Sequence, residues 1–380
     1  MLLDWVVPKK ENLWVIASHS GMVGNARFLA ENILESHAGI EVYFYSFYAG
    51  REQAETEAYF TGKYRHRFKL VKKRNLEALL AALRSGHIFI SHDIIRDVGF
   101  PLTNLKGRRA VINLWHGIAM KKQWLVKKYP VRASHREKAR QFSKVIASSA
   151  ADALAKAATF HKTLDDIWLT GNPRNDILMG KEMPGDLRQQ EERLRSELKG
   201  RSLVLYAPTW RSYARSFEPF PTGCLENLAG ILSERNCVLG LRLHEKDEAS
   251  FKELYSAGSC LNLGTKRYPE TQLLLRNTAI LVTDYSSIWL DFLLTGKPVV
   301  AYWPDLKSYS EHRGFLWDLE ELFPGPKATS CPELAAALRQ LISHQGQQGL
   351  QPGYRFVKKL FHQYTDGKCA ERVVSNAIIL

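Results

Sequence analysis

The chain has 380 residues, 45% hydrophobic and 24% charged, which is ordinary for a globular protein long enough for two domains. A net charge of +14 suits an anionic partner: phosphate groups, a nucleic acid or an anionic membrane surface. Five scattered cysteines without CxxC spacing indicate neither a disulfide framework nor a zinc site and fit a reducing cytoplasm. No apolar run approaches the roughly 20 residues of a membrane span.

Strand-length apolar runs alternate with helical patterns through the first half of the chain. A predicted helix occupies 76–83, and a helical pattern begins at Phe28 after a turn that contains Gly21 and Gly24. This turn lacks the GxGxxG fingerprint and is weak evidence of phosphate binding. The predicted strands are 12–17, 41–48, 87–91, 144–149, 167–171 and one that starts at Val111.

The strand from Val111 breaks at Trp115, His116 and Gly117. A histidine at a strand end, beside a glycine that lets a substrate approach, is well placed for proton transfer near neutral pH. A hydrogen-bonded structural histidine is the alternative.

Two stretches, 63–74 and 121–140, are rich in Lys and Arg. The first is typical of a solvated face and could also lie on phospholipid headgroups. The second is interleaved with Trp124 and aliphatic residues, which favours an interfacial patch for an anionic leaflet. Nucleic acid is the rival partner, but no nucleic-acid-binding signature accompanies the charge.

The second half is organised around the stretch 279–303. An apolar strand, 279–282, leads into a polar turn that ends with Ser286 and Ser287, then a helix that Gly296 should cap, and a strand, 299–302. Free N–H groups at the start of that helix favour an anion. Simple helix capping by the serines is the alternative.

Strands alternate with helices in both halves, which predicts an α/β protein of two doubly wound, Rossmann-like domains facing each other across a cleft. The predicted organisation is an N-terminal domain, a linker, a C-terminal domain and a C-terminal helical segment. Their bounds are 1–178, 179–201, 202–352 and 353–380.

Polar residues cluster at the predicted strand ends, where ligands bind in open α/β sheets. Arginines, two hydroxyls on a helix N-terminus and a histidine could hold a diphosphate and neutralise a leaving phosphate. These residues are His116, Arg174, Thr209, Arg211, Arg242, His244, Asp284, Ser286 and Ser287, followed by His312 and Arg313.

Several catalytic motifs are missing from the sequence. It has no HExxH, Walker A or GxSxG motif, and no DxD pair that would suggest a metal-bound nucleotide sugar. We therefore expect no metal and no cofactor. Direct transfer from a nucleotide-activated donor to a hydroxyl is the chemistry that remains.

Ten short blocks, in order from Val7 to about Val374, closely resemble the CDP-glycerol glycerophosphotransferases of teichoic acid and capsule synthesis. The blocks are VPKKENLWV, GNARFL, LWHGIAMKK, GNPRND, YAPTWR, RLH, TDYSSIWLDF, GKPVVAY, HRGF with a later PGP, and FHQYTDGKCAERV. The resemblance implies a GT-B fold, peripheral attachment to the cytoplasmic face of the cell membrane, and transfer of glycerol phosphate from CDP-glycerol with release of CMP. The domain 1–178 is then expected to face the acceptor and the membrane, and the domain 202–352 to bind CDP-glycerol.

The resemblance also implies roles for individual residues. His116 corresponds to the proposed general base, and His244, with Ser286 and Ser287, to the site of the donor diphosphate; we expect both histidines to be catalytic. Other residues of the matched blocks are expected to bind substrate: Asn25, Arg27, Gly117, Lys121, Asn172 and Thr283, beside Arg174, Thr209, Arg211, Arg242, Asp284 and Arg313.

The compact chain resembles the primases that add the first glycerol phosphate to an undecaprenyl-diphosphate-linked disaccharide, so primase activity is the favoured expectation. A glycerol phosphate or ribitol phosphate polymerase of teichoic acid or capsule is the alternative. A basic, non-enzymatic nucleotide- or RNA-binding α/β protein is an alternative of another class. No nucleic-acid partner is expected under the favoured reading, and the oligomeric state is left open.

Overall fold

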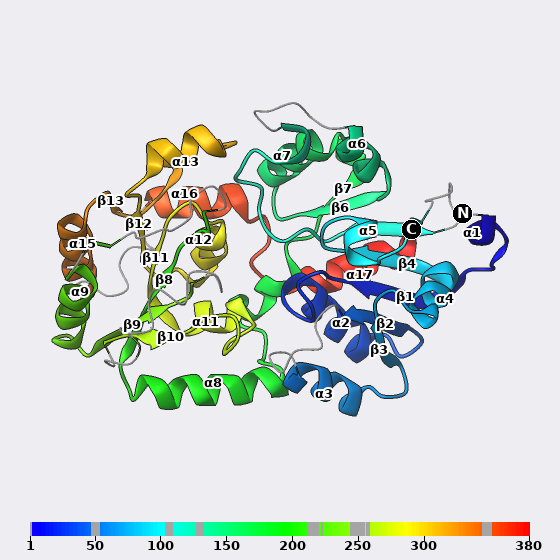
Figure 1. Cartoon of the computed structure of the whole chain (residues 1–380), viewed down its shortest axis with the longest axis horizontal. Coiled ribbons are helices and arrows are strands. Elements are labelled where there is room, and N and C mark those ends of the chain that lie inside the picture. The colour runs from blue at the N-terminus through cyan, green and yellow to red at the C-terminus, as the bar shows by residue number, and fades with distance from the viewer. Residues whose placement is uncertain are drawn as a thin grey trace. The chain divides into compact units, whose positions relative to one another are not determined.

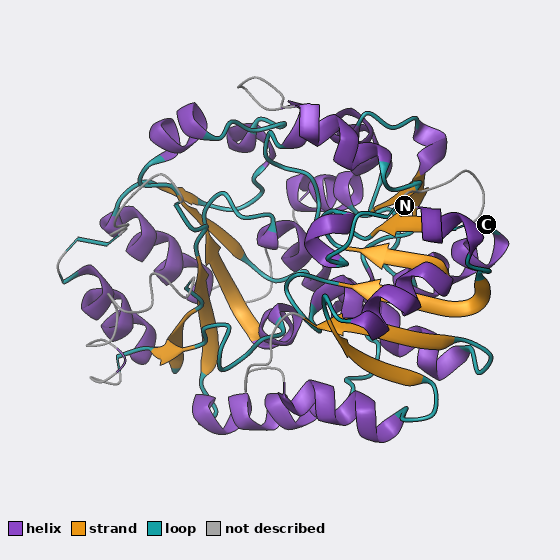
Figure 2. Ribbon diagram, turned by 45° about the vertical axis from the view of Figure 1, so that its right-hand side comes forward, coloured by secondary structure: helices purple, strands orange, loops and turns teal. Residues whose placement is uncertain are grey.

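The computed structural model describes residues 2–46, 54–102, 109–126, 133–211, 220–221, 223–243, 255, 259–343 and 352–380. The chain divides into two compact units, each built on one parallel sheet (Figures 1 and 2). Unit 1 comprises Met1–Glu182 and Phe361–Leu380, and unit 2 comprises Met183–Leu360. The unit boundary falls within the stretch 179–201 predicted as a linker.

Unit 1 contains a seven-stranded sheet in the order β3-β2-β1-β4-β5-β6-β7. All neighbouring strands pair in parallel, which requires a crossover between consecutive strands. The strands are β1 Lys10–Ala17, β2 Glu41–Ser46, β3 Phe68–Lys72, β4 Ser85–Ile90, β5 Ala110–Asn113, β6 Lys144–Ala147 and β7 Ile167–Leu169.

Helices cover both faces of this sheet, as expected for a doubly wound parallel sheet whose strands are buried on both sides. The helices of unit 1 are α1 Leu2–Val6, α2 Gly24–Ser36, α3 Ala54–Lys63, α4 Leu76–Arg84, α5 Ile94–Asp97, α6 Ala133–Arg140, α7 Ala150–Phe160 and α17 Cys369–Ile379, with 3₁₀ turns η2 Trp124–Val126, η3 Leu164–Asp166 and η4 Pro173–Met179.

A buried carboxylate attaches the C-terminal helix α17 to the rest of unit 1. Asp176 in η4 accepts hydrogen bonds from the backbone N–H groups of Cys369 (2.8 Å) and Ala370 (3.0 Å) at the start of α17. The last helix of the chain is therefore attached at its N-terminus to the turn that follows β7.

Unit 2 contains a six-stranded parallel sheet in the order β10-β9-β8-β11-β12-β13. Its strands are β8 Ser202–Ala207, β9 Cys237–Leu241, β10 Leu261–Asn262, β11 Thr278–Thr283, β12 Val299–Tyr302 and β13 Lys327–Ala328. Its helices are α8 Gly185–Leu198, α9 Cys224–Ser233, α11 Thr271–Asn277, α12 Ile288–Phe292, α13 Leu306–His312, α14 Leu319–Leu322, α15 Cys331–Ser343 and α16 Pro352–Phe361, with the 3₁₀ turn η6 Leu293–Thr295.

The strand–turn–helix–strand segment 279–303 forms as predicted. β11 leads through a polar turn into α12 and η6, and Gly296 ends the helical segment in the left-handed region with φ 71° before β12. Only a residue without a Cβ adopts this conformation at no steric cost, which explains the glycine. The predicted strands and helices of both units are confirmed within the described residues. Two α/β units with parallel sheets are what the expected GT-B fold requires.

One expectation from the cysteines was wrong. Cys224 at the start of α9 and Cys331 at the start of α15 form a disulfide, with their Cα atoms 6.1 Å apart. The two residues are 107 positions apart in sequence, so no local spacing of cysteines predicts the pair.

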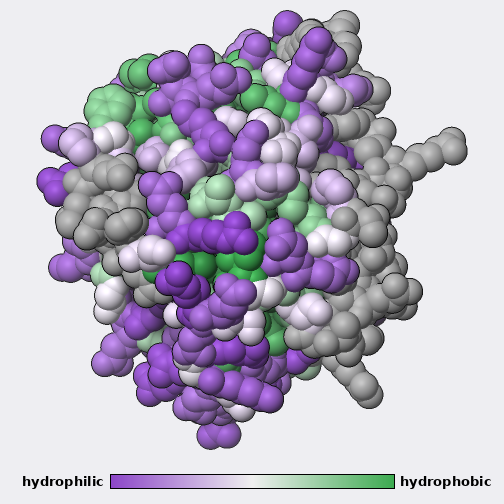
Figure 3. Space-filling view, turned by 90° about the vertical axis from the view of Figure 1, so that its left-hand side faces the viewer, coloured by the Kyte–Doolittle hydropathy of each residue, from purple (hydrophilic) through white to green (hydrophobic). Residues whose placement is uncertain are grey.

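The face of unit 2 that Figure 3 shows is mainly hydrophilic, with hydrophobic side chains scattered between the polar ones.

Candidate functional site

The turn after β5 carries His116 in unit 1. Trp115 has a positive φ of 49° and Gly117 a φ of 149°, so the backbone reverses sharply on both sides of the histidine. Positive φ at a tryptophan is costly, and such conformations persist where the surrounding structure enforces them. The turn leaves His116 exposed, while Trp115 and Ile118 on either side are buried.

Two side chains, the buried Asn25 and the partly buried Arg174, hold one side of this turn. The Asn25 amide, at the start of α2, donates to the carbonyls of Leu114 (3.0 Å) and Trp115 (3.3 Å). The Arg174 guanidinium donates to the carbonyl of His116 itself (2.8 Å). Asn25 Oδ1 accepts from the backbone N–H of Arg174 (3.2 Å), so the two side chains form one brace.

The far side of the turn is held by Asp152 on α7. Its carboxylate accepts from the backbone N–H of Ala119 (2.9 Å) and pairs with the Lys156 ammonium (2.8 Å), both side chains being fully buried. Lys156 also donates to the Ile146 carbonyl (2.9 Å). A buried ion pair with these additional hydrogen bonds is well satisfied, and it fixes the backbone after His116 to the helix.

Aromatic rings orient the His116 imidazole. The ring stacks on His92, with centroids 4.9 Å apart, and lies 4.0 Å from the Trp115 ring. A neutral imidazole keeps one ring nitrogen as an acceptor, which is the form that a general base requires.

The electrostatic surroundings keep this imidazole neutral. Desolvation, the neighbouring His92 and the positive charges of Arg174 and Lys156 lower the pKa of His116 well below its usual value. His92, whose pKa burial lowers to about 4, is also neutral at pH 7. The exposed histidine is therefore a deprotonated group next to a cationic guanidinium.

Behind His92 lies the buried carboxylate of Asp97. It accepts from the backbone N–H groups of Ser91 (2.7 Å), His92 (2.6 Å) and His19 (3.0 Å), and so ties the ends of β4 and β1 together. Burial raises its pKa to about 6. Sequence reasoning missed His92 and Asp97, although the polar pair His92–Asp93 directly after the strand 87–91 was a signal of a strand-end site.

In unit 2, the predicted site residues form a buried ion-pair network. Asp284 accepts from the backbone N–H of Thr209 (2.8 Å) and from the Arg211 guanidinium. Arg211 also donates twice to Asp305 (2.8 and 3.1 Å) and lies over the Tyr285 ring, 5.1 Å from its centroid. Asp305, which follows the strand 299–302, was not predicted.

Two more predicted residues of unit 2 hold its loops. Arg242 is buried and donates to the carbonyls of Leu263 (3.0 Å) and Tyr268 (2.8 Å) and to the Thr271 hydroxyl (2.8 Å). Thr283 donates to the Ala207 carbonyl (2.6 Å).

Ser286 and Ser287, before α12, are less buried than Arg211 and Arg242. Ser287 occupies the N-cap position but makes no side-chain capping hydrogen bond, and both serines are half-buried. Ser286 Oγ accepts only a long contact from the Ile288 N–H (3.4 Å). The capping alternative is thus not realised at Ser287.

The remaining predicted residues are spread more widely. Arg27 is buried and pairs with Glu31 on its own helix (3.2 Å). Asn172 is buried at the start of η4. Lys121 is half-buried and follows the His116 turn. Arg313 caps the end of α13, and its neighbour His312 is exposed. His244 lies outside the described residues.

Part of the predicted interfacial patch packs inward. Trp124 contacts the rings of Phe160 (5.2 Å) and Trp115 (6.0 Å) in the unit 1 core. Residues 127–132 lie outside the described part, and Lys138 in α6 pairs with Asp93 (3.0 Å). Lys122, Arg136 and Arg140 remain exposed.

The basic stretch 63–74 is largely engaged within unit 1. Lys63 pairs with Glu35 (3.0 Å), Lys69 pairs with Glu77 (3.1 Å), and Arg67 donates to the His37 carbonyl at the end of α2 (2.9 Å).

The described residues include no group of three or more His, Cys, Asp or Glu side chains that could hold a metal ion. Within the same ranges, every helix falls short of the length and apolar character needed to cross a membrane.

Comparison with solved structures finds the fold of the wall teichoic acid polymerase TagF, with a TM-score of 0.79, 20% identity, and coverage of 99% of this chain and 91% of that one. The teichoic acid poly(ribitol-phosphate) polymerase of Bacillus spizizenii is 24% identical over 98% of this chain and 57% of its own length. The teichoic acid glycerol-phosphate primase of the same organism is 26% identical over 75% of this chain and 73% of its own length.

The chain thus spans between about a third and three fifths of the first curated relatives that it matches. The family model described as CDP-glycerol:poly(glycerophosphate) glycerophosphotransferase matches residues 1–379. With the fold shared with TagF, this match shows that the chain belongs to the CDP-glycerol:poly(glycerophosphate) glycerophosphotransferase family.

Proposed function

We propose that the chain transfers glycerol phosphate from CDP-glycerol to a hydroxyl of a membrane lipid-linked disaccharide and releases CMP. The observation that carries this proposal is the exposed, neutral imidazole of His116 on a turn braced by Asn25 and Arg174. Family membership supports the donor, and the glycerol-phosphate primase of B. spizizenii is a relative.

In the proposed reaction, His116 takes the proton of the acceptor hydroxyl. The oxygen attacks the β-phosphorus of CDP-glycerol in line, a new P–O bond forms, and the P–O bond to CMP breaks. The leaving CMP carries the electron pair of that bond. The imidazolium then returns its proton to solvent, which the exposed position of His116 allows.

Unit 2 supplies donor binding in this proposal. Ser286 and Ser287 offer their hydroxyls and the N–H groups at the start of α12 to the diphosphate, where the helix dipole favours an anion. His244 is assigned to the same diphosphate. Arg211 and Arg242 act by holding the loops, because protein acceptors already engage their guanidinium groups.

The test is incubation with CDP-glycerol and a lipid-linked disaccharide analogue, followed by product mass analysis. CMP release with one added unit identifies a primase. A ladder of products identifies a polymerase, an alternative that the polymerase relatives and TagF favour. A parallel reaction with CDP-ribitol separates the two donors, and tight RNA binding without CMP release would overturn the proposal.

We also propose peripheral attachment to the cytoplasmic face of the cell membrane. The support is the +14 charge and the exposed cations Lys122, Arg136 and Arg140. Vesicle binding should require anionic lipid and weaken as salt rises. Equal binding to neutral vesicles at high salt would contradict this attachment.

A further inference from the structure

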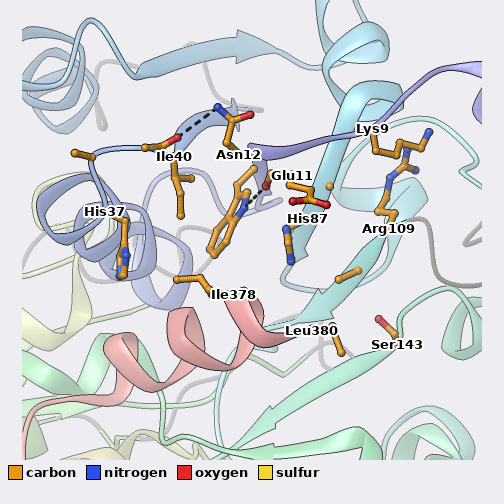
Figure 4. A pocket seen from close by; sticks show the side chains of 15 residues that line it. Lys9, Glu11, Asn12, His37, Ile40, His87, Arg109, Ser143, Ile378 and Leu380 are labelled. Carbon is orange, nitrogen blue, oxygen red and sulfur yellow. Dashed lines mark hydrogen bonds between the residues drawn. The ribbon is translucent and has the colours of Figure 1, made fainter.

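A cavity of about 1060 Å³ lies at the amino-terminal edge of the unit 1 sheet. Residues at or just before the starts of β1, β4 and β5 line it, among them Asn12, His87 and Arg109 (Figure 4). His116 follows the other end of β5, so the strand separates this cavity from the proposed catalytic edge. Ligand pockets in proteins range from about 300 to 1,000 Å³, which makes the cavity large enough for a small amphiphile.

One wall of the cavity is apolar. Trp14 and Ile40 line it from the sheet side, and Ile378 and Leu380 line it from the end of α17. Ile378 and Leu380 are 53% and 58% exposed, so their side chains keep apolar surface available for a ligand. Burying such surface yields about 25 cal/mol per Å², which favours an apolar chain here.

The polar groups of the cavity favour a ligand that can donate a hydrogen bond. His87 Nε2 lies 2.9 Å from the Ala377 carbonyl, which can only accept, so Nε2 carries the proton. His87 Nδ1 is buried and has no hydrogen-bond partner among the described residues. The nearby Glu11 carbonyl already accepts from the Trp14 indole (2.8 Å). Because a buried acceptor without a partner is costly, a ligand hydroxyl at this position would be stabilising.

The charges of the cavity do not favour an anionic head group. Lys9 and Arg109 line it, but both pair with the Asp4 carboxylate at 2.7 Å. Glu11 contributes a carboxylate to the lining itself. Two cations are thus balanced by two anions, in contrast to the net charge of the whole chain.

We propose that this cavity binds an uncharged amphiphile, with its apolar chain against Trp14, Ile40 and Ile378 and a hydroxyl-bearing head at His87 and Asn12. A hydroxyl both donates and accepts, so it can donate to His87 Nδ1 while it accepts from the Asn12 amide. The proposal concerns a second site and does not depend on the transfer reaction.

The first experiment measures binding of octyl glucoside, below its critical micelle concentration, to the full chain by isothermal titration calorimetry. Gly39 lines the cavity and a Cβ placed there meets nothing within 4 Å, so Gly39→Phe fills the space without a clash in the protein. We expect Gly39→Phe to weaken binding at least about tenfold. Gly62→Phe on α3, where a Cβ also meets nothing, is the matched control and should bind as the unmodified chain does.

Ile378→Asp provides an independent variant at an exposed position and should cause a similar loss by removing part of the apolar wall. Circular dichroism verifies folding of each variant. Unchanged affinity in folded Gly39→Phe and Ile378→Asp would overturn the proposal.

The second experiment tests the head group. His87→Phe keeps a planar ring but removes the Nδ1 acceptor, so it should lower affinity for octyl glucoside while leaving affinity for octyl methyl ether unchanged. Octyl phosphate should bind more weakly than octyl glucoside to the unmodified chain, and glucose should not bind detectably. Tighter binding of octyl phosphate would overturn the assignment of an uncharged head.

Discussion

The strand ends of unit 1 and unit 2 use their polar residues in different ways. In unit 1, Asn25 and Arg174 bond to the backbone around His116 and leave its imidazole exposed. In unit 2, the charges of Arg211, Asp284 and Asp305 are satisfied by one another. The first unit thus presents an exposed imidazole, whereas the second builds a buried ion-pair network.

We expect this difference to distinguish residues that contact a substrate from residues that position other groups. The guanidinium N–H groups of Arg211 that bond to Asp305 could bind a substrate only if these ion pairs broke. The half-buried serines before α12 have no such engagement. We therefore expect substitutions in the two units to affect activity and stability to different degrees.

Replacing His116 should give the largest effect on turnover. Without the base, His116→Ala should lower kcat at least about a hundredfold, because general acid–base catalysis contributes roughly 10²–10⁴. The KM for CDP-glycerol should change little, and CMP release measures both constants. His66→Ala, at an exposed histidine of unit 1, is the control. A fully active His116→Ala enzyme would remove the base from the mechanism.

The next test contrasts two arginines. Arg211→Met leaves Asp284 and Asp305 as buried or partly buried carboxylates without their cation, which should lower the free energy of unfolding by about 3–5 kcal/mol. Arg174 is only half-buried, so Arg174→Met should change stability much less while lowering kcat. Urea denaturation and CMP release provide the two readouts.

Equal losses of stability in Arg211→Met and Arg174→Met would show that the two units do not differ in this respect. A stable Arg211→Met variant with a raised KM for CDP-glycerol would instead support the direct substrate contact predicted from the sequence.

The sequence was sufficient to predict the alternating strands, the α/β class and the strand-end position of His116. These features depend on local apolar runs and on residues that end helices, such as Gly296 and Pro298, and a single sequence displays both. The Cys224–Cys331 bond and the partners of Asp176 could not be predicted, because they join residues more than a hundred positions apart.

The strand-end rule found the candidate site but could not distinguish contact residues from positioning residues. Arg211 and Arg242 were expected to bind substrate because polar groups at strand ends often do. Asn25 was expected to do so because it lies in a block that resembles the family. Whether a polar group faces solvent or a backbone carbonyl depends on tertiary packing, as the bonds from Asn25 to Leu114 and Trp115 illustrate. Their predicted substrate contacts stay predictions.

A smaller effect is expected when the brace is weakened. Asn25→Ala removes the bonds to the Leu114 and Trp115 carbonyls and leaves those carbonyls buried, so the His116 turn should relax from its positive-φ conformation. We expect kcat to fall roughly tenfold to thirtyfold, in line with a loss of about 1.4–2 kcal/mol. The KM for CDP-glycerol should stay within about twofold. A raised KM with unchanged kcat would indicate substrate binding by Asn25 instead.

The smallest effect concerns pH. An imidazole with an ordinary pKa near 6.5 would be half protonated at pH 6.5 and would give about half of the maximal rate. Desolvation, His92 and Arg174 lower the pKa of His116, so the base should already be deprotonated at pH 6.5 and kcat/KM should stay flat from there to pH 7.5. Removing the guanidinium in Arg174→Met takes away one positive neighbour and should raise the pKa of His116, which moves the acidic limb of the profile to higher pH. An acidic limb that does not move in Arg174→Met would show that Arg174 acts on the imidazole only through the backbone of the turn. A limb that moves to lower pH would contradict the predicted sign of its electrostatic effect.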